Sequence, residues 1–436
     1  MTRYKYLLAA VLFISIIACK KDYQDPSGPS QEQAYSTPQA LTNVAVGLQA
    51  WYARERTGLL YTVVTSGSLL NGETYVTNPG NTDEAQIGTG GNAILNNNVI
   101  VTGMWAVTNK MAFEADNILS RTDKVVSDKS YASGLVAYAS IFKAIALGVQ
   151  AGFWEQVPDT IGKPDSVRND VKFIPAKQGY ARAVAVLDNA INVITATPPS
   201  NAFLTNVPRG INILNTLYAL KARYALYMAD YATSLAAANK VDLTVKSTLD
   251  FTEQITNPIF FLVASTNNIY QVVDSAMGLP VGLQPDLTDK RVPFYIKTQT
   301  DKKPRFVMNG FYNSNTASVP VYLPGEITLI KAECYARQNN IAQGLAELNK
   351  VVTKKPVQSE DPFLLGADLP PVVAATQPEL LTQIYKHRRI ELFMGGQELE
   401  DSRRFGRPVA ERKRNYFPYP FVERNDNPNT PPDPAF

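Results

Sequence analysis

The chain has 436 residues, with 42 basic and 39 acidic side chains, two cysteines and one histidine. This near balance of charge argues against a nucleic-acid partner, which would require a basic excess. So few cysteines and histidines give little support to Cys/His metal sites or Ser-His-Asp catalysis. We expect no metal, no cofactor and no enzyme activity, although a site built from carboxylates alone stays open.

The first eighteen residues have the layout of an export signal. Residues 1–5 carry two positive charges, and Leu7 to Ala18 is apolar apart from Ser15. This run is shorter than the roughly 20 residues of a membrane-spanning helix. We therefore expect a signal peptide over residues 1–18, and no membrane-spanning segment in the rest of the chain.

The end of this signal resembles a bacterial lipobox, since Ile16, Ile17 and Ala18 precede Cys19. In a lipobox the cysteine becomes the lipid-modified first residue, and several acyl chains anchor a protein more firmly than one. The alternative is an ordinary signal peptide that happens to contain a cysteine. Residues 20–40 are polar and rich in proline, so we expect residues 19–40 to form a lipidated cysteine and a flexible tether.

Apolar residues at helical spacing predict a series of helices after the tether. The tryptophans at positions 51, 105 and 154 fall on apolar faces of these helices, so we expect them in the core. Between the first two helices, Thr65 to Asn98 is rich in Gly, Asn and Thr and is expected to be a long loop, a type of segment that is often functional. The expected helices are Leu41–Arg56, Met104–Ser120, Tyr131–Trp154 and Ala176–Ala196.

Two later segments read as copies of one helical hairpin. The first lies near residues 210–243 with a break at 229–231, and the second near 325–352 with a break at 339–340. Small residues stand twelve apart in both, Ala222 with Ser234 and Ala332 with Gly344, where paired helices would cross. The pattern resembles the tetratricopeptide unit; two generic helical hairpins are the alternative.

The segments around these hairpins are less regular. Residues 242–324 combine short apolar runs with many turn residues, which indicates an irregular insertion with short strands. Residues 414–436 are rich in proline and asparagine, and we expect them to lie extended over the surface. Cys334 is expected to be a small buried residue. The sequence therefore predicts a mostly α fold of helical hairpins, with a loop-rich insertion and a few short strands.

The C-terminal motif is similar to the signature of SusD/RagB-type nutrient-binding outer-membrane lipoproteins of Bacteroidetes-type bacteria. The chain departs from it at His387, Gly395 and Leu399, where the family usually has an acid, Glu and Trp. Other segments follow the family order: Ala115–Leu119, Phe153–Pro158, Pro418–Glu423 and Asn427–Asn429. The matching residues of the signature are Arg388, Arg389, Glu391, Leu392, Gly396, Asp401, Arg403, Arg404 and Phe405.

This resemblance implies a single helical SusD-like domain over residues 41–436 that does not catalyse a reaction. It also implies a lipid-anchored protein of the outer membrane, exposed at the cell surface. Such a protein binds a nutrient, usually a glycan and in some cases a peptide, and delivers it to a SusC-like TonB-dependent transporter. The alternatives are a tetratricopeptide-type envelope scaffold that binds another protein and, with least support, a carboxylate-based glycoside hydrolase.

Sugar binding requires aromatic faces together with amide, carboxylate or guanidinium groups. The predicted early loop and the insertion offer both, and the resemblance implies that ligand binds where these two regions meet. The alternative is that these residues only form turns or core. We expect the paired arginines of the signature to form ion pairs with Glu391 and Asp401. The candidate ligand-binding residues are Asn71, Glu73, Tyr75, Tyr270, Tyr295, Arg305 and Tyr312, with Phe294 and Phe311 beside them.

Overall fold

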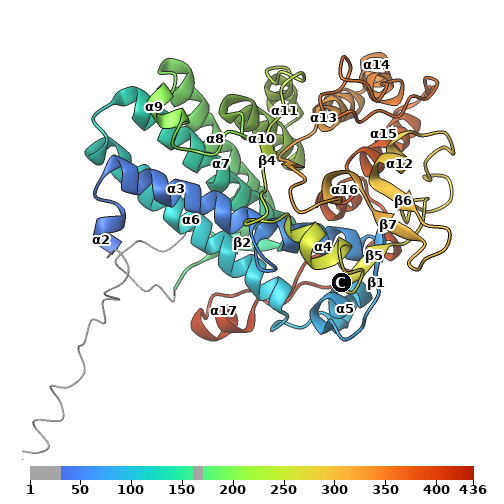
Figure 1. Ribbon diagram of the computed structural model, residues 1–436, viewed down its shortest axis with the longest axis horizontal. Helices are drawn as coiled ribbons and strands as arrows, with labels where there is room; N and C mark the ends of the chain where they lie inside the picture. Colours follow the sequence, from blue (N-terminus) through green and yellow to red (C-terminus); the bar gives the residue numbers. More distant parts are fainter. Residues whose placement is uncertain (1–30, 161–169) are drawn as a thin grey trace, which may run out of the picture.

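The computed structural model describes residues 31–160 and 170–436 and shows a mostly helical protein (Figure 1). The predicted signal peptide, Cys19 and most of the predicted tether lie outside the described residues. The last ten residues of that tether are folded, which corrects the boundary at Ala40. They form α2 (Gln31–Ala34) and the start of α3 (Pro38–Ala53). Between these helices Tyr35 is buried, and its hydroxyl donates to Glu114 of α6 (Val99–Val125).

The N-terminal half is a layer of long helices whose starts are capped by side chains. Thr37 accepts the Ala40 amide at the start of α3, and Asn98 and Asp128 cap the next two long helices in the same way. The expected helices are confirmed with shifted ends. The helices of this half also include α4 (Leu59–Leu70), α7 (Lys129–Phe153), α8 (Ala176–Ala196) and α9 (Asn201–Leu204).

Helix α7 is the central helix of this layer. Within the described residues it is the one helix long and apolar enough to cross a membrane, but 83% of its most apolar window is buried in the protein. Length and composition alone would therefore have admitted α7 as a membrane span, whereas its burial is typical of a core helix. The small residues of α7 allow close packing. A Cβ on Gly148 would lie 2.2 Å from the Tyr224 ring of α10 (Ile213–Tyr227).

Both predicted hairpins are present. The first pairs α10 with α11 (Tyr231–Ala238), and the second pairs α13 (Pro324–Arg337) with α14 (Ile341–Val352). Each break has a residue with positive φ, Ala229 at 64° and Asn339 at 62°, followed by a residue whose side chain caps the second helix. The same local conformation at both breaks explains why the two units look alike in sequence.

The small residues lie where the helices of each hairpin cross. Ser234 Oγ donates to the Ala222 carbonyl at 2.8 Å, and a Cβ on Gly344 would lie 3.1 Å from the Ala332 carbonyl oxygen. Larger side chains would force the backbones apart. The prediction from spacing is confirmed for both pairs.

The predicted loop over residues 65–98 is largely ordered secondary structure, which corrects that prediction. Its first part belongs to α4, which is enclosed on all sides, with eleven of its twelve residues buried. Most of the Gly and Asn residues that suggested a loop lie at the ends of elements or between them, whereas Thr65 and Gly67 lie inside α4. After α4 come β1 (Thr74–Val76), α5 (Thr82–Thr89) and η1 (Gly91–Ala93).

The insertion is irregular with short strands, as expected. Strand β1 pairs antiparallel with β5, placing Thr74 opposite Val272, so the early segment and the insertion meet. The other two-stranded pairs are β2–β3, β4–β8 and β6–β7. The elements are β2 (Gln156–Pro158), β3 (Phe173–Pro175), β4 (Thr248–Leu249), η2 (Phe260–Ala264), β5 (Tyr270–Val272), α12 (Arg291–Tyr295), β6 (Ile296–Thr298), β7 (Phe306–Met308), η3 (Gly310–Tyr312) and β8 (Val319–Pro320).

The C-terminal region packs α15 (Gln377–Glu391) and α16 (Glu398–Arg404) against the second hairpin and α4. The end of the chain is mostly irregular, but it is not wholly superficial. Phe417 and Tyr419 are buried beside Trp154, because their rings fill the gap between the helices and β2. The remaining elements here are η4 (Val409–Glu411) and α17 (Phe421–Asp426).

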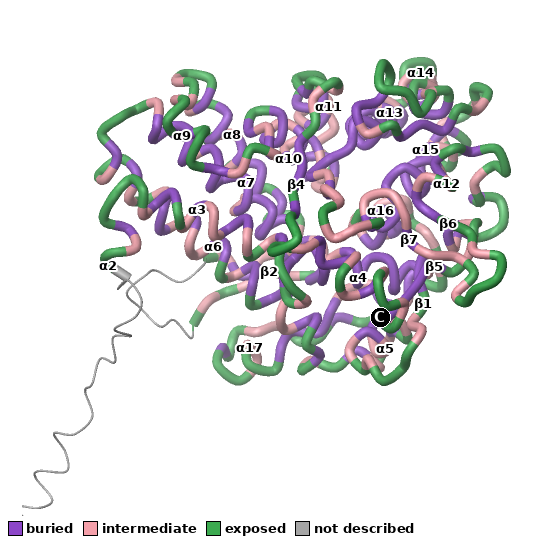
Figure 2. Tube along the Cα trace, viewed as in Figure 1, coloured by how far each residue is buried: buried purple, intermediate pink, exposed green. Residues whose placement is uncertain are grey.

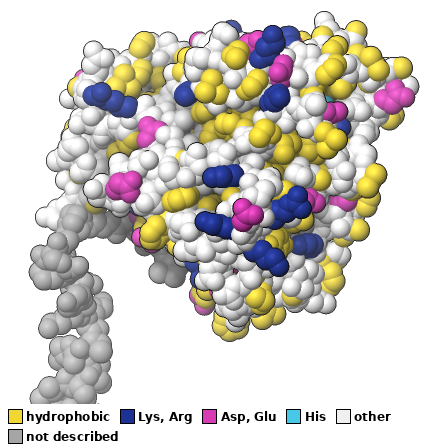
Figure 3. Space-filling view, turned by 45° about the vertical axis from the view of Figure 1, so that its right-hand side comes forward, with side chains coloured by type: hydrophobic (Ala, Val, Ile, Leu, Met, Phe, Trp, Pro, Cys, Tyr) yellow, Lys and Arg dark blue, Asp and Glu magenta, His cyan; other side chains and the backbone are white. Residues whose placement is uncertain are grey.

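Buried residues run through the long helices of both halves (Figure 2). Trp105 and Trp154 contact edge to face at 4.9 Å between ring centroids, and Cys334 is buried, as predicted. Trp51 is 47% exposed, so its assignment to the core was wrong. On the face shown in Figure 3, hydrophobic side chains gather in a central hollow, and Lys and Arg side chains group below it.

Candidate functional site

A groove opens in the insertion between the β4–β8 pair, the start of β6 and the end of β7. Its volume is about 500 Å³, within the range of small-molecule sites. We call it the insertion groove. Its lining residues are Lys246, Thr248, Asp250, Phe294, Asn309, Gly310, Phe311, Asn313, Ser318 and Phe363.

Three half-buried phenylalanines form the apolar wall of the insertion groove. Phe311 contacts Phe294 and Phe363 edge to face, with ring centroids 5.2 and 5.7 Å apart. Gly310 makes this packing possible. Its φ is 59°, and a Cβ there would lie 2.8 Å from the Phe294 ring. Tyr295 braces the wall from behind, 5.0 Å from Phe294.

The polar groups of the insertion groove are held in place, but some of their hydrogen-bonding atoms have no partner among the described residues. Asp250 Oδ1 accepts hydrogen bonds from Thr248 Oγ1 and Ser318 Oγ, both at 2.8 Å. No described residue donates to Asp250 Oδ2. Lys246 Nζ lies 5.3 Å above the Phe363 ring. An oriented carboxylate and an ammonium beside aromatic rings suit a ligand with hydroxyl groups on an apolar ring.

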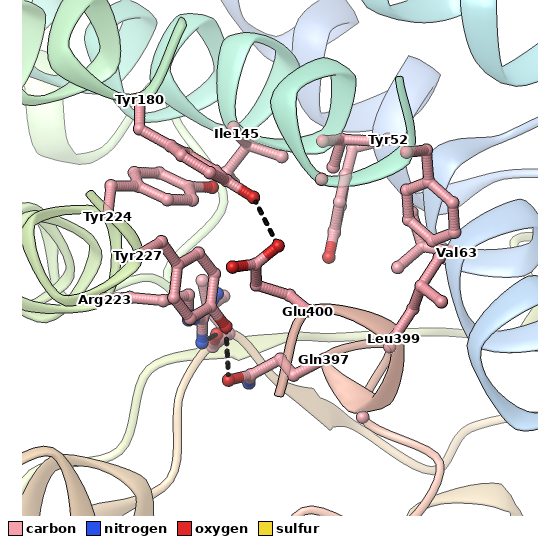
Figure 4. A pocket seen from close by; sticks show the side chains of 17 residues that line it. Tyr52, Val63, Ile145, Tyr180, Arg223, Tyr224, Tyr227, Gln397, Leu399 and Glu400 are labelled. Carbon is pink, nitrogen blue, oxygen red and sulfur yellow. Dashed lines mark hydrogen bonds between the residues drawn. The ribbon is translucent and has the colours of Figure 1, made fainter. Parts of the chain in front are cut away.

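A second cavity lies between α7, α8 and α10 on one side and the start of α16 on the other (Figure 4). It holds about 70 Å³, room for a few water molecules. Its polar groups bond to one another: Tyr227 Oη donates to Gln397 at 3.0 Å, and Tyr180 Oη donates to Glu400 Oε2 at 3.2 Å. Burial raises the pKa of Tyr227 well above its ordinary value, so its hydroxyl stays a neutral donor. This cavity lies between closely packed helices and is too small for a sugar.

No family model matches the sequence, and no curated protein matches it. Solved structures do match. A SusD superfamily protein from Bacteroides vulgatus superposes with a TM-score of 0.70 at 14% identity, covering 92% of this chain and 100% of that chain. A SusD-like carbohydrate binding protein from Bacteroides fragilis gives a TM-score of 0.69 at 13% identity, covering 91% and 99%. A SusD superfamily protein from the same species gives 0.68 at 16% identity, covering 91% and 99%.

The chain has the SusD fold. At these identities the match concerns the fold, and it confirms the fold that the sequence resemblance implied.

Within this SusD fold, four of the predicted ligand-binding residues are buried, and each forms a hydrogen bond or an ion pair with another residue of the chain. Asn71 Nδ2 donates to the Gly67 carbonyl, and Tyr295 Oη donates to the Glu391 carbonyl at 2.6 Å. Glu73 pairs with Arg389, and Tyr270 shares a hydrogen bond with Thr65. A side chain that is wholly enclosed cannot touch a ligand, so these four assignments are corrected to structural roles.

The other three predicted residues differ from one another. Tyr312 lies beneath the groove, where its hydroxyl donates to the Met394 carbonyl at 2.9 Å, so it too is structural. Tyr75 on β1 is 43% exposed, and Arg305 is exposed before β7. These two remain predictions. The expected meeting of the two regions is therefore present, and it occurs through the β1–β5 pairing, in which Tyr270 is buried and Tyr75 is exposed.

The insertion groove also contains residues that sequence reasoning missed, chiefly Lys246, Asp250 and Phe363. They come from two segments, the one around β4 and the irregular one around residue 363, where neither helical nor strand periodicity shows which side chain is accessible. The only available signal was an aromatic residue, Phe363, after a proline in a segment without periodicity. Phe294 and Phe311 were among the aromatics expected to offer faces, and both line the groove.

The arginines of the C-terminal signature form a buried ion-pair network. Arg388 Nε lies 2.9 Å from Asp401 Oδ2, and Arg404 contacts Asp401 and Glu333. Although burial opposes ionisation, Arg388 and Arg404 hold the pKa of Asp401 below its ordinary value. The expected pairing with Asp401 is confirmed. Glu391 instead pairs with Arg291 and Lys354, since α15 turns it toward α12.

Proposed function

We propose that the protein is a cell-surface lipoprotein that binds a glycan in the insertion groove and delivers it to a SusC-like TonB-dependent transporter. The groove carries the proposal, because it combines three aromatic rings with an oriented carboxylate and has room for a sugar. The fold supports it, since solved proteins of this fold include a SusD-like carbohydrate binding protein. The lipobox-like sequence ending in Cys19 supports the anchor.

Ligand binding is tested with the full-length protein purified from membranes in detergent. Calorimetric titration with a panel of neutral and acidic oligosaccharides and of short peptides should give heat with a glycan. Asp250→Asn should weaken that binding about tenfold, because hydrogen bonds to a charged group contribute about 1.5 kcal/mol. Asp123→Asn, an 89% exposed control on α6, should not change it. Heat with peptides alone would make the ligand a peptide, and no heat with any probe would favour a scaffold.

Anchoring and partnership need separate measurements. Cys19→Ser should release the protein from the membrane fraction, because a lipid-anchored protein without its acyl chains has no strong hold on a bilayer. The native protein should co-purify with a TonB-dependent barrel after mild solubilisation. A barrel-free preparation under conditions that preserve membrane complexes would contradict the partnership, even if glycan binding were found.

A further inference from the structure

The hairpin formed by β6 and β7 is strongly basic. Over residues 296–308 it carries four basic side chains, Lys297, Lys302, Lys303 and Arg305, against one acidic side chain, Asp301, a net charge of +3. All four basic side chains are exposed. We call this segment the basic hairpin. Because the whole chain is nearly neutral, this local excess is a property of the segment and not of the composition.

These cations lack the partners that other cations of the fold have. No described carboxylate lies within ion-pair distance of any of the four. In contrast, Arg223, Arg291 and Arg388 each hold a carboxylate at 2.6–3.1 Å. A charge that the fold does not neutralise is available to an external anion.

The basic hairpin has a defined conformation. Its strands pair in register from Ile296 opposite Met308 to Thr298 opposite Phe306. Beyond the strands, Gln299 N donates to the Arg305 carbonyl at 2.7 Å, and the Gln299 side chain donates to the Pro304 carbonyl at 3.0 Å. The Arg305 guanidinium lies 5.4 Å from the Phe306 ring centroid. The cations are thus presented on an ordered support.

The basic hairpin rises from the rim of the insertion groove. Phe294 of the groove stands two residues before β6, and Asn309 and Gly310 of the groove directly follow β7. From this rim, six residues to the tip of the hairpin span about 20 Å. Lys246 inside the groove adds a fifth cation with no described carboxylate partner. Asp250 is the one carboxylate in the lining, and it lies on the opposite β4 side.

We propose that the basic hairpin selects acidic glycans, whose uronate carboxylates or sulfate esters bind Lys297, Lys302, Lys303 and Arg305 while one sugar ring occupies the insertion groove. This rests on the proposed function and adds the substrate class to it. Such contacts are exposed, so each contributes modestly and weakens with salt. Their effect comes from several charges acting on one repeating anion.

The test compares two matched triple variants of the full-length protein. One removes three hairpin charges, Lys302→Gln, Lys303→Gln and Arg305→Gln. The control removes three exposed cations that do not line the groove, Lys124→Gln on α6, Lys177→Gln on α8 and Lys240→Gln just after α11. Each is titrated with oligogalacturonate, a sulfated chondroitin oligosaccharide, maltoheptaose and a neutral galactan, at low salt and at physiological salt.

The proposal expects an acidic probe to bind best and to lose about tenfold in affinity in the hairpin variant, with no change in the control. Raising the salt concentration should lower the affinity of the native protein for the acidic probe, and it should lower the affinity of the hairpin variant less. Binding of neutral probes alone, unchanged in the hairpin variant, would overturn the acidic selectivity and leave the proposed function standing. No binding of any glycan would overturn both. Both variants are also tested for sedimentation with phosphatidylglycerol vesicles; loss of vesicle binding in the hairpin variant, without an effect on glycans, would overturn the proposal and assign the basic hairpin to a lipid surface.

Discussion

The C-terminal ion-pair network and the basic hairpin contain the same kinds of residue in opposite surroundings. In the network, Arg388 and Asp401 are almost wholly enclosed, and each guanidinium has a carboxylate in contact. In the basic hairpin, Lys302 and Arg305 are exposed and have no such partner among the described residues. The comparison teaches that an arginine-rich stretch shows its role only through burial. Enclosed charges must be neutralised within the fold, whereas exposed ones can meet a ligand.

The largest expected effect comes from removing a partner in the network. Asp401→Asn leaves the enclosed Arg388 without its carboxylate, which should lower the free energy of unfolding by about 3–5 kcal/mol. Urea unfolding followed by circular dichroism measures this loss. Asp123→Asn, whose carboxylate is exposed, should change the free energy of unfolding by less than about 0.5 kcal/mol. Equal effects of the two variants would remove the contrast between enclosed and exposed charges.

One buried carboxylate, that of Glu398, has no cation as an ion-pair partner among the described residues. Glu73 accepts from Arg389 and from the Met394 amide, whereas Glu398 accepts only from the Gly396 amide, and its Oε2 has no partner among the described residues. Burial and the nearby Glu73 raise the pKa of Glu398 well above its ordinary value. Glu398 therefore holds a proton in the folded protein at a pH where the unfolded chain has lost it.

This proton gives stability a pH dependence of known sign. A raised folded pKa means that the stabilisation is complete below the ordinary carboxyl range and is lost as pH rises toward the raised value. The slope should approach about 1.4 kcal/mol per pH unit above about pH 4.5. Glu398→Gln, which mimics the protonated side chain, should remove this part of the slope in urea titrations at successive pH values. An unchanged slope in Glu398→Gln would mean that another group holds the proton.

A groove variant should affect ligand binding more than folding. Phe363→Ala removes one of the three rings of the insertion groove and should weaken binding of an identified glycan about tenfold, or about 1.4 kcal/mol. Phe261→Ala is the matched control. Phe261 lies in the insertion and is 54% exposed, but it does not line the groove. Calorimetry measures both. Loss of binding in the control alone would move the site away from the insertion groove.

The smallest expected effect concerns the stability of the basic hairpin variant. Replacing Lys302, Lys303 and Arg305 by glutamine should change the free energy of unfolding by less than about 0.5 kcal/mol, since these charges have no internal partners to lose. Urea unfolding of this variant beside Asp401→Asn gives the direct contrast. A large destabilisation would show that the hairpin charges have internal roles, as those of the network do.

The sequence alone determined the helical architecture of this protein. Helical periodicity and small residues at fixed spacing are local properties, and they predicted the two hairpins with their breaks at Ala229 and Asn339. The ordered C-terminal motifs predicted the SusD fold. The insertion was predicted as irregular because its short apolar runs are separated by turn residues. The helices and the breaks could be predicted because periodicity and turn residues act within a few residues of one another along the chain.

Only the tertiary structure decided which side chains are accessible. Tyr270 and Tyr295 looked like ligand-binding aromatics, yet strand pairing and α15 enclose them. Trp51 looked like core and is 47% exposed, since the described residues leave that part of α3 uncovered. Asp250 and Phe363 lie more than a hundred residues apart and share the insertion groove through contacts that no local pattern records. Exposure depends on what packs over a residue, and in an irregular segment that partner comes from elsewhere in the chain.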